Sequence, residues 1–142
     1  MADKLEGELL NKALENQQNA ILLKLNTKQI TEMNKQIVYS IPRISAKAAT
    51  SHLKTLKGYR YVDEISDLKT NVYIKWIRLD TPNKLTKGAI SCSVKITDEG
   101  MLVMCKNYYG KFFYLNMDEC VIFQKITPEE GVLLAAMDFI TK

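Results

Sequence analysis

Hydrophobic and polar positions alternate with a period of two through most of the chain between residues 59 and 125. Five or six short segments of this kind follow one another, separated by Gly, Asn, Asp and Pro residues. The segment from Ala89 to Thr97 alternates most regularly. Its pattern predicts that one set of residues points inward (Ile90, Cys92, Val94 and Ile96) and the other outward (Ser91, Ser93, Lys95 and Thr97). Such spacing predicts a compact antiparallel sheet.

In the segment 72–79, Val72, Ile74 and Trp76 share one face, which assigns Trp76 to the core and puts Tyr73 and Lys75 on the other face. Strands this short, joined by tight turns, are typical of small barrels of the SH3-like, Sm-like or OB-like kind. The predicted fold class is therefore α+β, mainly β: a five- or six-stranded antiparallel small barrel with a C-terminal helix and an N-terminal helical arm.

Helical spacing of apolar residues flanks this β segment on both sides. Residues 3–26 repeat at three- and four-residue steps, and the pattern continues toward the Ile41-Pro42 step, which ends it. Whether Thr27 begins a second helix or lies inside a continuous one stays open. So does the choice between an oligomerising coiled coil and an amphipathic helix that lies on its own domain or on a partner. Residues 45–56 form either a short helix or a hinge.

The C-terminal helix has a strong start signal. Thr127, Pro128 and Glu130 supply an N-cap, a proline at the first helical position and the acid of a capping box. We expect this helix to plug one end of the barrel or to cover a face of the sheet. The chain then divides into a helical arm (1–40), which is a candidate oligomerisation segment, a basic linker or short helix (41–57), and a small β-barrel domain with its C-terminal helix (58–142).

The formal net charge of +4 is unevenly placed. Residues 1–57 contain nine Lys and Arg against five Asp and Glu, whereas the two signs balance in residues 58–142. A basic arm suggests a polyanion or an acidic partner, and the alternative is a solvated linker. No apolar run reaches the roughly 18 residues of a membrane span, and the mixed charges after Met1 are not those of a secretory signal. We expect an intracellular protein without membrane contact.

Three cysteines, at positions 92, 105 and 120, match neither a disulfide framework nor a zinc site, which indicates a reducing compartment. No catalytic motif is present. His52 is the only histidine and has no partner residues at a recognisable spacing, and the adjacent acids at 63–64, 98–99 and 118–119 fall in predicted turns. The sequence therefore predicts no enzyme, with no catalytic or metal-binding residues, no cofactor and no small-molecule substrate.

Aromatic residues alternate with basic ones at three places in the β segment. Small barrels bind single-stranded nucleic acid by stacking bases on exposed aromatic rings beside Lys and Arg. The candidate contact residues are Tyr59, Arg60, Tyr73, Lys75, Tyr108, Tyr109 and Lys111. Tyr108 and Tyr109 belong to a predicted hairpin loop and are the best candidates for exposed rings. The alternative is that these tyrosines serve only the sheet, which favours tyrosine in any case.

Three stretches of the chain carry a resemblance: GYRYVDEISDL at 58–68, YIKWI at 73–77 and VIFQKIT at 121–127. Over residues 58–140 the chain resembles small uncharacterised proteins of nucleocytoplasmic large DNA viruses. The resemblance implies a viral origin, with the virion or the viral factory in the host cytoplasm as the setting. These proteins have no established activity, so no functional residue is carried over.

Two functions follow as hypotheses. The first is a non-enzymatic interaction or assembly module, such as a viral structural or accessory protein. It would act through self-association or a protein partner, using the N-terminal helix and the surface of the β-domain. The alternative is a single-stranded nucleic-acid-binding small barrel that uses the basic and aromatic residues above.

Overall fold

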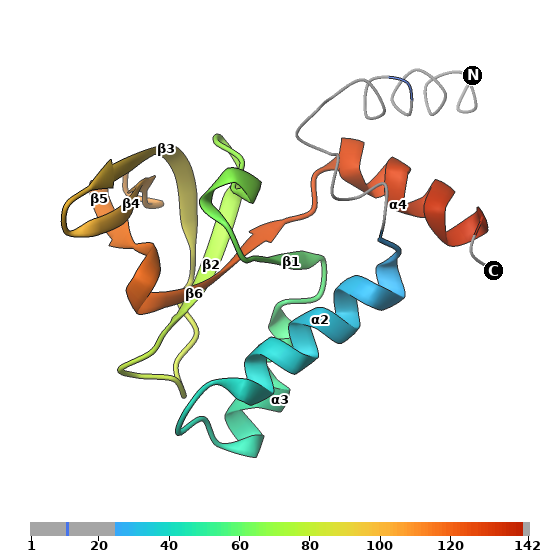
Figure 1. The fold of residues 1–142 in the computed structure, drawn as a ribbon, viewed down its shortest axis with the longest axis horizontal. Helices are drawn as coiled ribbons and strands as arrows, with labels where there is room; N and C mark the ends of the chain where they lie inside the picture. Colours follow the sequence, from blue (N-terminus) through green and yellow to red (C-terminus); the bar gives the residue numbers. More distant parts are fainter. Residues whose placement is uncertain (1–10, 12–24, 141–142) are drawn as a thin grey trace. The chain divides into compact units, whose positions relative to one another are not determined.

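The computed structural model of the chain describes residue 11 and residues 25–140 (Figure 1). The helix predicted over residues 3–26 lies almost entirely outside the described residues. The chain divides into two compact units, Met33–Lys125 and Met1–Glu32 with Ile126–Lys142. The elements are α2 (Thr27–Ser40), α3 (Ala46–Thr55), β1 (Tyr59–Val62), η2 (Ile65–Asp67), β2 (Tyr73–Arg78), β3 (Ala89–Thr97), β4 (Gly100–Lys106), β5 (Phe112–Asn116), η3 (Met117–Glu119), β6 (Cys120–Lys125) and α4 (Pro128–Ile140).

The six strands form one antiparallel sheet in the order β1-β6-β2-β3-β4-β5 (Figure 1). Strands β2 to β5 form a meander, and β6 returns to lie between β1 and β2. This confirms the predicted α+β class with a mainly antiparallel sheet. No ladder joins β1 to β5 among the described strands, so the sheet is open, and closure into a barrel stays a prediction.

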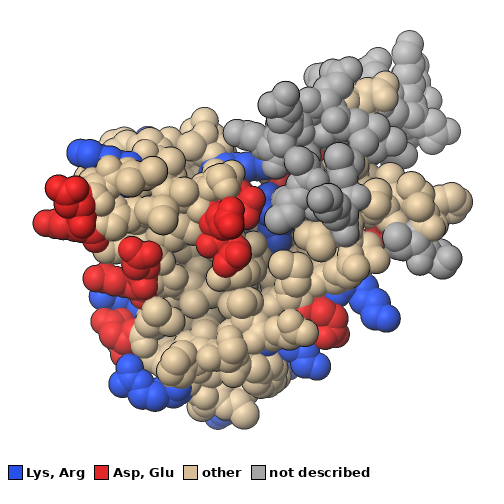
Figure 2. Space-filling model, in the orientation of Figure 1, with Lys and Arg blue, Asp and Glu red and all other residues tan. Residues whose placement is uncertain are grey.

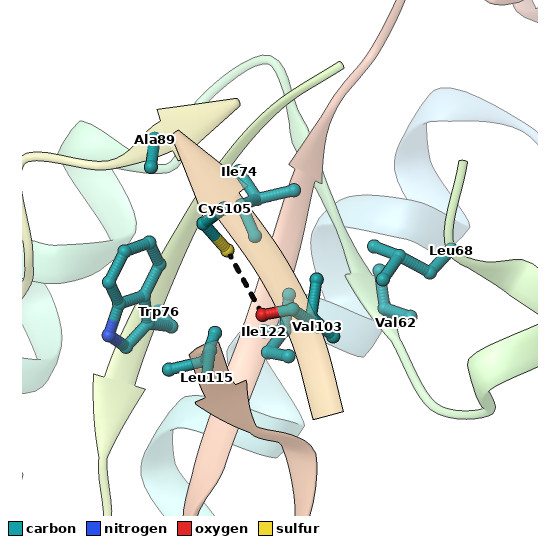
Figure 3. Packing of buried hydrophobic residues seen from close by; sticks show 9 residues of the cluster. All are labelled: Val62, Leu68, Ile74, Trp76, Ala89, Val103, Cys105, Leu115 and Ile122. Carbon is teal, nitrogen blue, oxygen red and sulfur yellow. Dashed lines mark hydrogen bonds between the residues drawn. The ribbon is translucent and has the colours of Figure 1, made fainter. Parts of the chain in front are cut away.

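The inner face of the sheet carries the main core (Figure 3). The buried side chains are Val62, Leu68, Ile74, Trp76, Ala89, Val103, Cys105, Leu115 and Ile122. Trp76 is 7% exposed, as its register with Ile74 predicted, and its ring lies 5.8 Å from that of Phe113. Cys105 packs as a small apolar residue, and its thiol donates to the carbonyl of Val103 at 3.6 Å.

The predicted orientation of β3 is wrong before its β-bulge. Ser91 is 1% exposed, whereas Ile90 is 43% exposed on the outer face. A β-bulge between Ser91 and Ser93 then reverses the alternation, so Val94 and Ile96 lie opposite Val103 and Met101. They are nevertheless 42% and 76% exposed. The reason is that β2 pairs with β3 only through Tyr73 and Ile74, so the rest of the β3–β4 hairpin has no strand of β2 beside it.

Ser91 is buried because its hydroxyl satisfies the backbone of the 63–72 connection. Its Oγ lies 2.7 Å from the carbonyl oxygen of Lys69 and 3.1 Å from that of Val72. The same connection is bonded to Gln124 of β6, whose Oε1 accepts from the N–H of Lys69 at 3.0 Å and whose Nε2 donates to the carbonyl of Asp67 at 2.7 Å. Asn71 ends the connection with φ at 62°, the left-handed turn predicted for it.

The outer face of the sheet is covered over only part of its area. A second core joins Ile77 of β2 and Phe123 of β6 to Val38, Ile41, Ala49 and Leu56 of the α2–α3 segment. Ser45 caps α3 by accepting from the N–H of Ala48 at 3.1 Å, which confirms the predicted short helix over the alternative of a hinge. The covered area lies over β1, β6 and the C-terminal half of β2.

In the other unit, Asn26 and Gln29 form a reciprocal cap, with bonds of 2.8 and 3.1 Å, that begins α2 at Thr27. The side chain of Asp138 accepts from the N–H and the hydroxyl of Thr27 at 2.8 and 2.6 Å. The predicted capping box of α4 is confirmed, since Thr127 and Glu130 exchange bonds of 3.0 and 3.2 Å. No helix among the described residues is both long enough and apolar enough to cross a bilayer.

We predict that Gln124→Leu destabilises the fold by about 2–4 kcal/mol, because the buried carbonyl of Asp67 loses its donor and the N–H of Lys69 loses an acceptor. Urea denaturation followed by circular dichroism measures the change. Gln36→Leu on the exposed side of α2 is the control and should stay within about 0.5 kcal/mol of the parent. Equal stability of the two variants would contradict a stabilising role for the hydrogen bonds of Gln124 to Asp67 and Lys69.

Burial raises the pKa of the Cys105 thiol to about 12 and that of Cys120 to about 11. Because only the thiolate reacts with alkylating agents, we predict that Cys105 stays unlabelled by iodoacetamide near pH 8 in the folded protein and reacts once urea unfolds it. The Cys105 thiol ionises at a higher pH in the folded protein than in the unfolded chain. Its contribution to the stability of the fold is therefore complete below the unfolded pKa and is lost as the pH rises toward 12. Mass spectrometry of tryptic peptides reads the labelling, and rapid native labelling of Cys105 would contradict this packing.

Candidate functional site

The uncovered part of the outer face carries a row of side chains that runs across four strands. Tyr73 of β2 pairs with Ile90 of β3, Ile90 with Lys106 of β4, and Lys106 with Phe112 of β5. Directly paired residues of antiparallel strands point to the same side, so the row is contiguous. Tyr73, Ile90 and Phe112 are 36%, 43% and 61% exposed.

Further exposed aromatic rings adjoin this row. Tyr114 stands two residues after Phe112 on the same face and is 58% exposed. Tyr108 and Tyr109, in the β4–β5 loop, are 94% and 85% exposed, as the sequence predicted. We call the surface formed by these side chains the aromatic–lysine face. Its members are Tyr73, Ile90, Lys106, Tyr108, Tyr109, Phe112 and Tyr114.

The charges on the strands have one sign. None of the six described strands contains an acidic residue, and four lysines occupy outward positions: Lys75, Lys95, Lys106 and Lys125. The Nζ of Lys106 lies 5.7 Å from the ring centre of Phe112, and that of Lys75 lies 5.4 Å from the ring centre of Tyr59. Cations held beside aromatic rings are the arrangement that binds stacked bases and phosphates together.

The β4–β5 loop is fixed by its own hydrogen bonds. The Oδ1 of Asn107 accepts from the N–H groups of Tyr109 and Lys111, each at 2.9 Å, and the N–H of Gly110 donates to the carbonyl of Asn107 at 3.0 Å. Gly110 has φ at 80° and closes the turn. The rings of Tyr108 and Tyr109 meet edge to face at 5.6 Å. The loop therefore holds two large rings in solvent on a rigid backbone.

Tyr73 is held in place on the neighbouring loop. Its hydroxyl donates to the carbonyl of Lys87 at 2.9 Å. Its ring lies against Gly88, where an added Cβ would come within 2.6 Å of the ring carbon Cε1 and of the carbonyl oxygen of Ile74. A glycine is required at this position for the ring to lie where it does.

Three of the four other candidate contact residues are less accessible. Tyr59 is half-buried beside the helix-covered part of the face, and burial raises the pKa of its hydroxyl. Arg60 points to the opposite face of β1 and is 4% exposed, so we leave it out of the aromatic–lysine face. Lys111 is exposed directly after the loop, and Lys75 is half-buried against Tyr59.

Sequence reasoning did not select Ile90, Phe112 and Tyr114. Ile90 was assigned to the core by an alternation that the bulge breaks. Phe112 and Tyr114 could have been found, because they share one side of a strand whose other side carries Phe113 and Leu115.

The other candidates for chemistry are His52 and the paired acids. His52 is buried, and its Nε2 lies 3.1 Å from the carbonyl oxygen of Pro82, which ties α3 to the β2–β3 loop. Asp63, Glu64 and Asp118 line a hollow of about 430 Å³, and Figure 2 shows acidic side chains in separate groups with uncharged surface between them. Among the described residues, no group of three or more His, Cys, Asp or Glu could hold a metal ion.

Comparison with known proteins gives no relative: no protein family, no curated protein and no solved structure matches the chain.

The role of Gly88 can be tested against a second glycine with similar backbone geometry. Gly88 and Gly58 have φ at 101° and 87°, but an added Cβ at Gly58 would meet nothing within 4 Å. We predict that Gly58→Ala costs about 1–3 kcal/mol from backbone strain alone, and that Gly88→Ala costs clearly more because it also displaces Tyr73. Thermal or urea denaturation measures both, and equal losses would contradict the close packing of Tyr73 on Gly88.

Proposed function

We propose that this protein binds single-stranded nucleic acid on the aromatic–lysine face. The observation that carries the proposal is the row of Tyr73, Ile90, Lys106 and Phe112, which puts aromatic, aliphatic and cationic groups on one open surface. Stacking on aromatic side chains accepts any base, because every base has a flat apolar face, and lysines follow the phosphates.

The exposure of the rings supports a binding role. Large apolar side chains gathered on one surface are rare in proteins that leave that surface in water, and such a patch marks a binding site. The second core supports this reading, because α2 and α3 cover the neighbouring part of the same face with apolar contacts. Since the charged residues of the strands are all basic, the surface favours a negatively charged partner over an uncharged one.

The strand order is compatible with the small-barrel class. A meander of four strands whose fifth strand returns to pair with the first brings the two ends of the sheet toward each other. We propose that the sheet belongs to this class, whose members present one face and the adjoining loops to single strands.

We predict that the double variant Phe112→Ala/Tyr114→Ala binds a mixed-sequence single-stranded oligonucleotide at least about tenfold more weakly than the parent, because each stacked base contributes about 1–3 kcal/mol. Fluorescence anisotropy with a labelled oligomer of about 12 nucleotides measures the Kd. The matched control is Tyr39→Ala/Phe139→Ala, which removes two rings that are 47% and 79% exposed and lie outside the sheet.

Binding should also weaken with salt. If three lysines contact phosphates, the logarithm of the association constant falls with the logarithm of salt concentration with a slope of about −2. Absence of binding at low salt, or equal losses in the two double variants, would overturn the proposal.

A second candidate is assembly with a further copy or a protein partner. The specific observation is that β5 is an edge strand, paired only with β4 among the described strands, so one edge of its backbone is open for strand addition. The N-terminal segment of residues 1–40, which the sequence predicts as a helical arm, would contribute to the same assembly, and the resemblance to viral proteins suggests a virion or viral-factory setting. Light scattering of the full chain separates the two candidates: an oligomer whose mass ignores added oligonucleotide favours assembly.

A further inference from the structure

We infer that the hollow between Tyr73 and the β4–β5 loop is a pocket for a single nucleotide, and that it anchors the strand on the aromatic–lysine face. This inference rests on the proposed function and assigns one site within it. The hollow has a volume of about 460 Å³ and is lined by Tyr73, Ile90, Lys106 and the loop residues 107–110. Pockets that hold small ligands have volumes of about 300–1,000 Å³, so there is room for one nucleotide.

The lining selects the chemical class of the ligand. Three tyrosines and an isoleucine are among the lining residues, and the only charged side chain in that set is Lys106. Aromatic walls also bind cations such as methylated lysine, but a lysine in the wall repels such a ligand. A flat apolar ring that carries a negative group fits both features, and a nucleotide has that composition.

Tyr73 and the backbone of the β4–β5 loop are held in place before any ligand arrives. Tyr73 is fixed by the carbonyl of Lys87 and by Gly88, and the loop is fixed by Asn107. Groups that are already held lose little conformational entropy on binding. The rings of Tyr108 and Tyr109, which are 94% and 85% exposed, would be ordered by the ligand at a cost.

Asn107 limits how the base is recognised. Its Oδ1 already accepts two backbone N–H groups, so toward a ligand the side chain can offer only the N–H donors of Nδ2. Every base has ring or carbonyl acceptors, so a group that only donates does not single out one base. We therefore expect stacking in this pocket to be tolerant of sequence.

The anchor can be separated from the rest of the face by cross-linking. We would irradiate the full chain with single-stranded oligonucleotides that carry one 5-iodouracil and map the cross-linked peptides by mass spectrometry. We expect cross-links at Tyr73 and at Tyr108 or Tyr109. Tyr108→Ala/Tyr109→Ala and Lys106→Gln should each weaken binding by about tenfold. Phe112→Ala/Tyr114→Ala should keep the cross-link at Tyr73, and Lys84→Gln, an exposed lysine outside the face, should bind like the parent.

The other outcomes test the nucleotide pocket and the proposed function separately. Cross-links confined to Phe112 and Tyr114, with parent-like binding by Tyr108→Ala/Tyr109→Ala, would overturn the pocket and leave the proposed function standing. Titration with adenosine monophosphate, followed by NMR shifts of the tyrosine rings, covers the other case. Binding of the mononucleotide without binding of any oligonucleotide would overturn the proposed function and support the pocket, and binding of neither would overturn both.

Discussion

The packing of Phe123 and Ile77 under α2 and α3 decides which part of the sheet is available for function. These two side chains are fully buried on the outer face of β6 and β2, against Val38, Ala49 and Leu56. Because α3 is also tied to the β2–β3 loop through His52 and Pro82, the helical cover stays over this end of the sheet. The outer face from Tyr73 toward β5 is left open by the same arrangement.

The β-bulge at Ser91–Ser93 determines what that open surface contains. Before the bulge, Ser91 turns inward to bond the carbonyls of Lys69 and Val72, and this turns Ile90 outward between Tyr73 and Lys106. Without the carbonyl groups of the 63–72 connection, β3 would favour Ile90 on the inner face in place of Ser91. The reason is that an unpaired hydroxyl in a core costs about 1–3 kcal/mol. The apolar centre of the aromatic–lysine face thus follows from a hydrogen-bonding requirement on the other side of the sheet.

These two features mark the limit of what the sequence predicts. Local signals were sufficient for the number of strands, for Trp76 in the core, for the left-handed Asn71 and for the capping box of Thr127 and Glu130, since each depends on neighbours a few residues away. The bulge and the buried Ser91 depend on residues about twenty positions distant. Tyr73, Tyr108 and Tyr109 were separate candidates in the sequence, and their meeting around one hollow was not predicted because it depends on strand order.

Because the described strands contain no acidic residues, the open surface favours negatively charged ligands. The acids between residues 58 and 125 lie outside the strands, and Asp63, Glu64 and Asp118 line the hollow of about 430 Å³. A protein that needed only solubility would gain as much from acids on an exposed strand face as from lysines, since either sign keeps the surface hydrated. Lys106, placed between Ile90 and the exposed ring of Phe112, instead favours a ligand that is both flat and negatively charged.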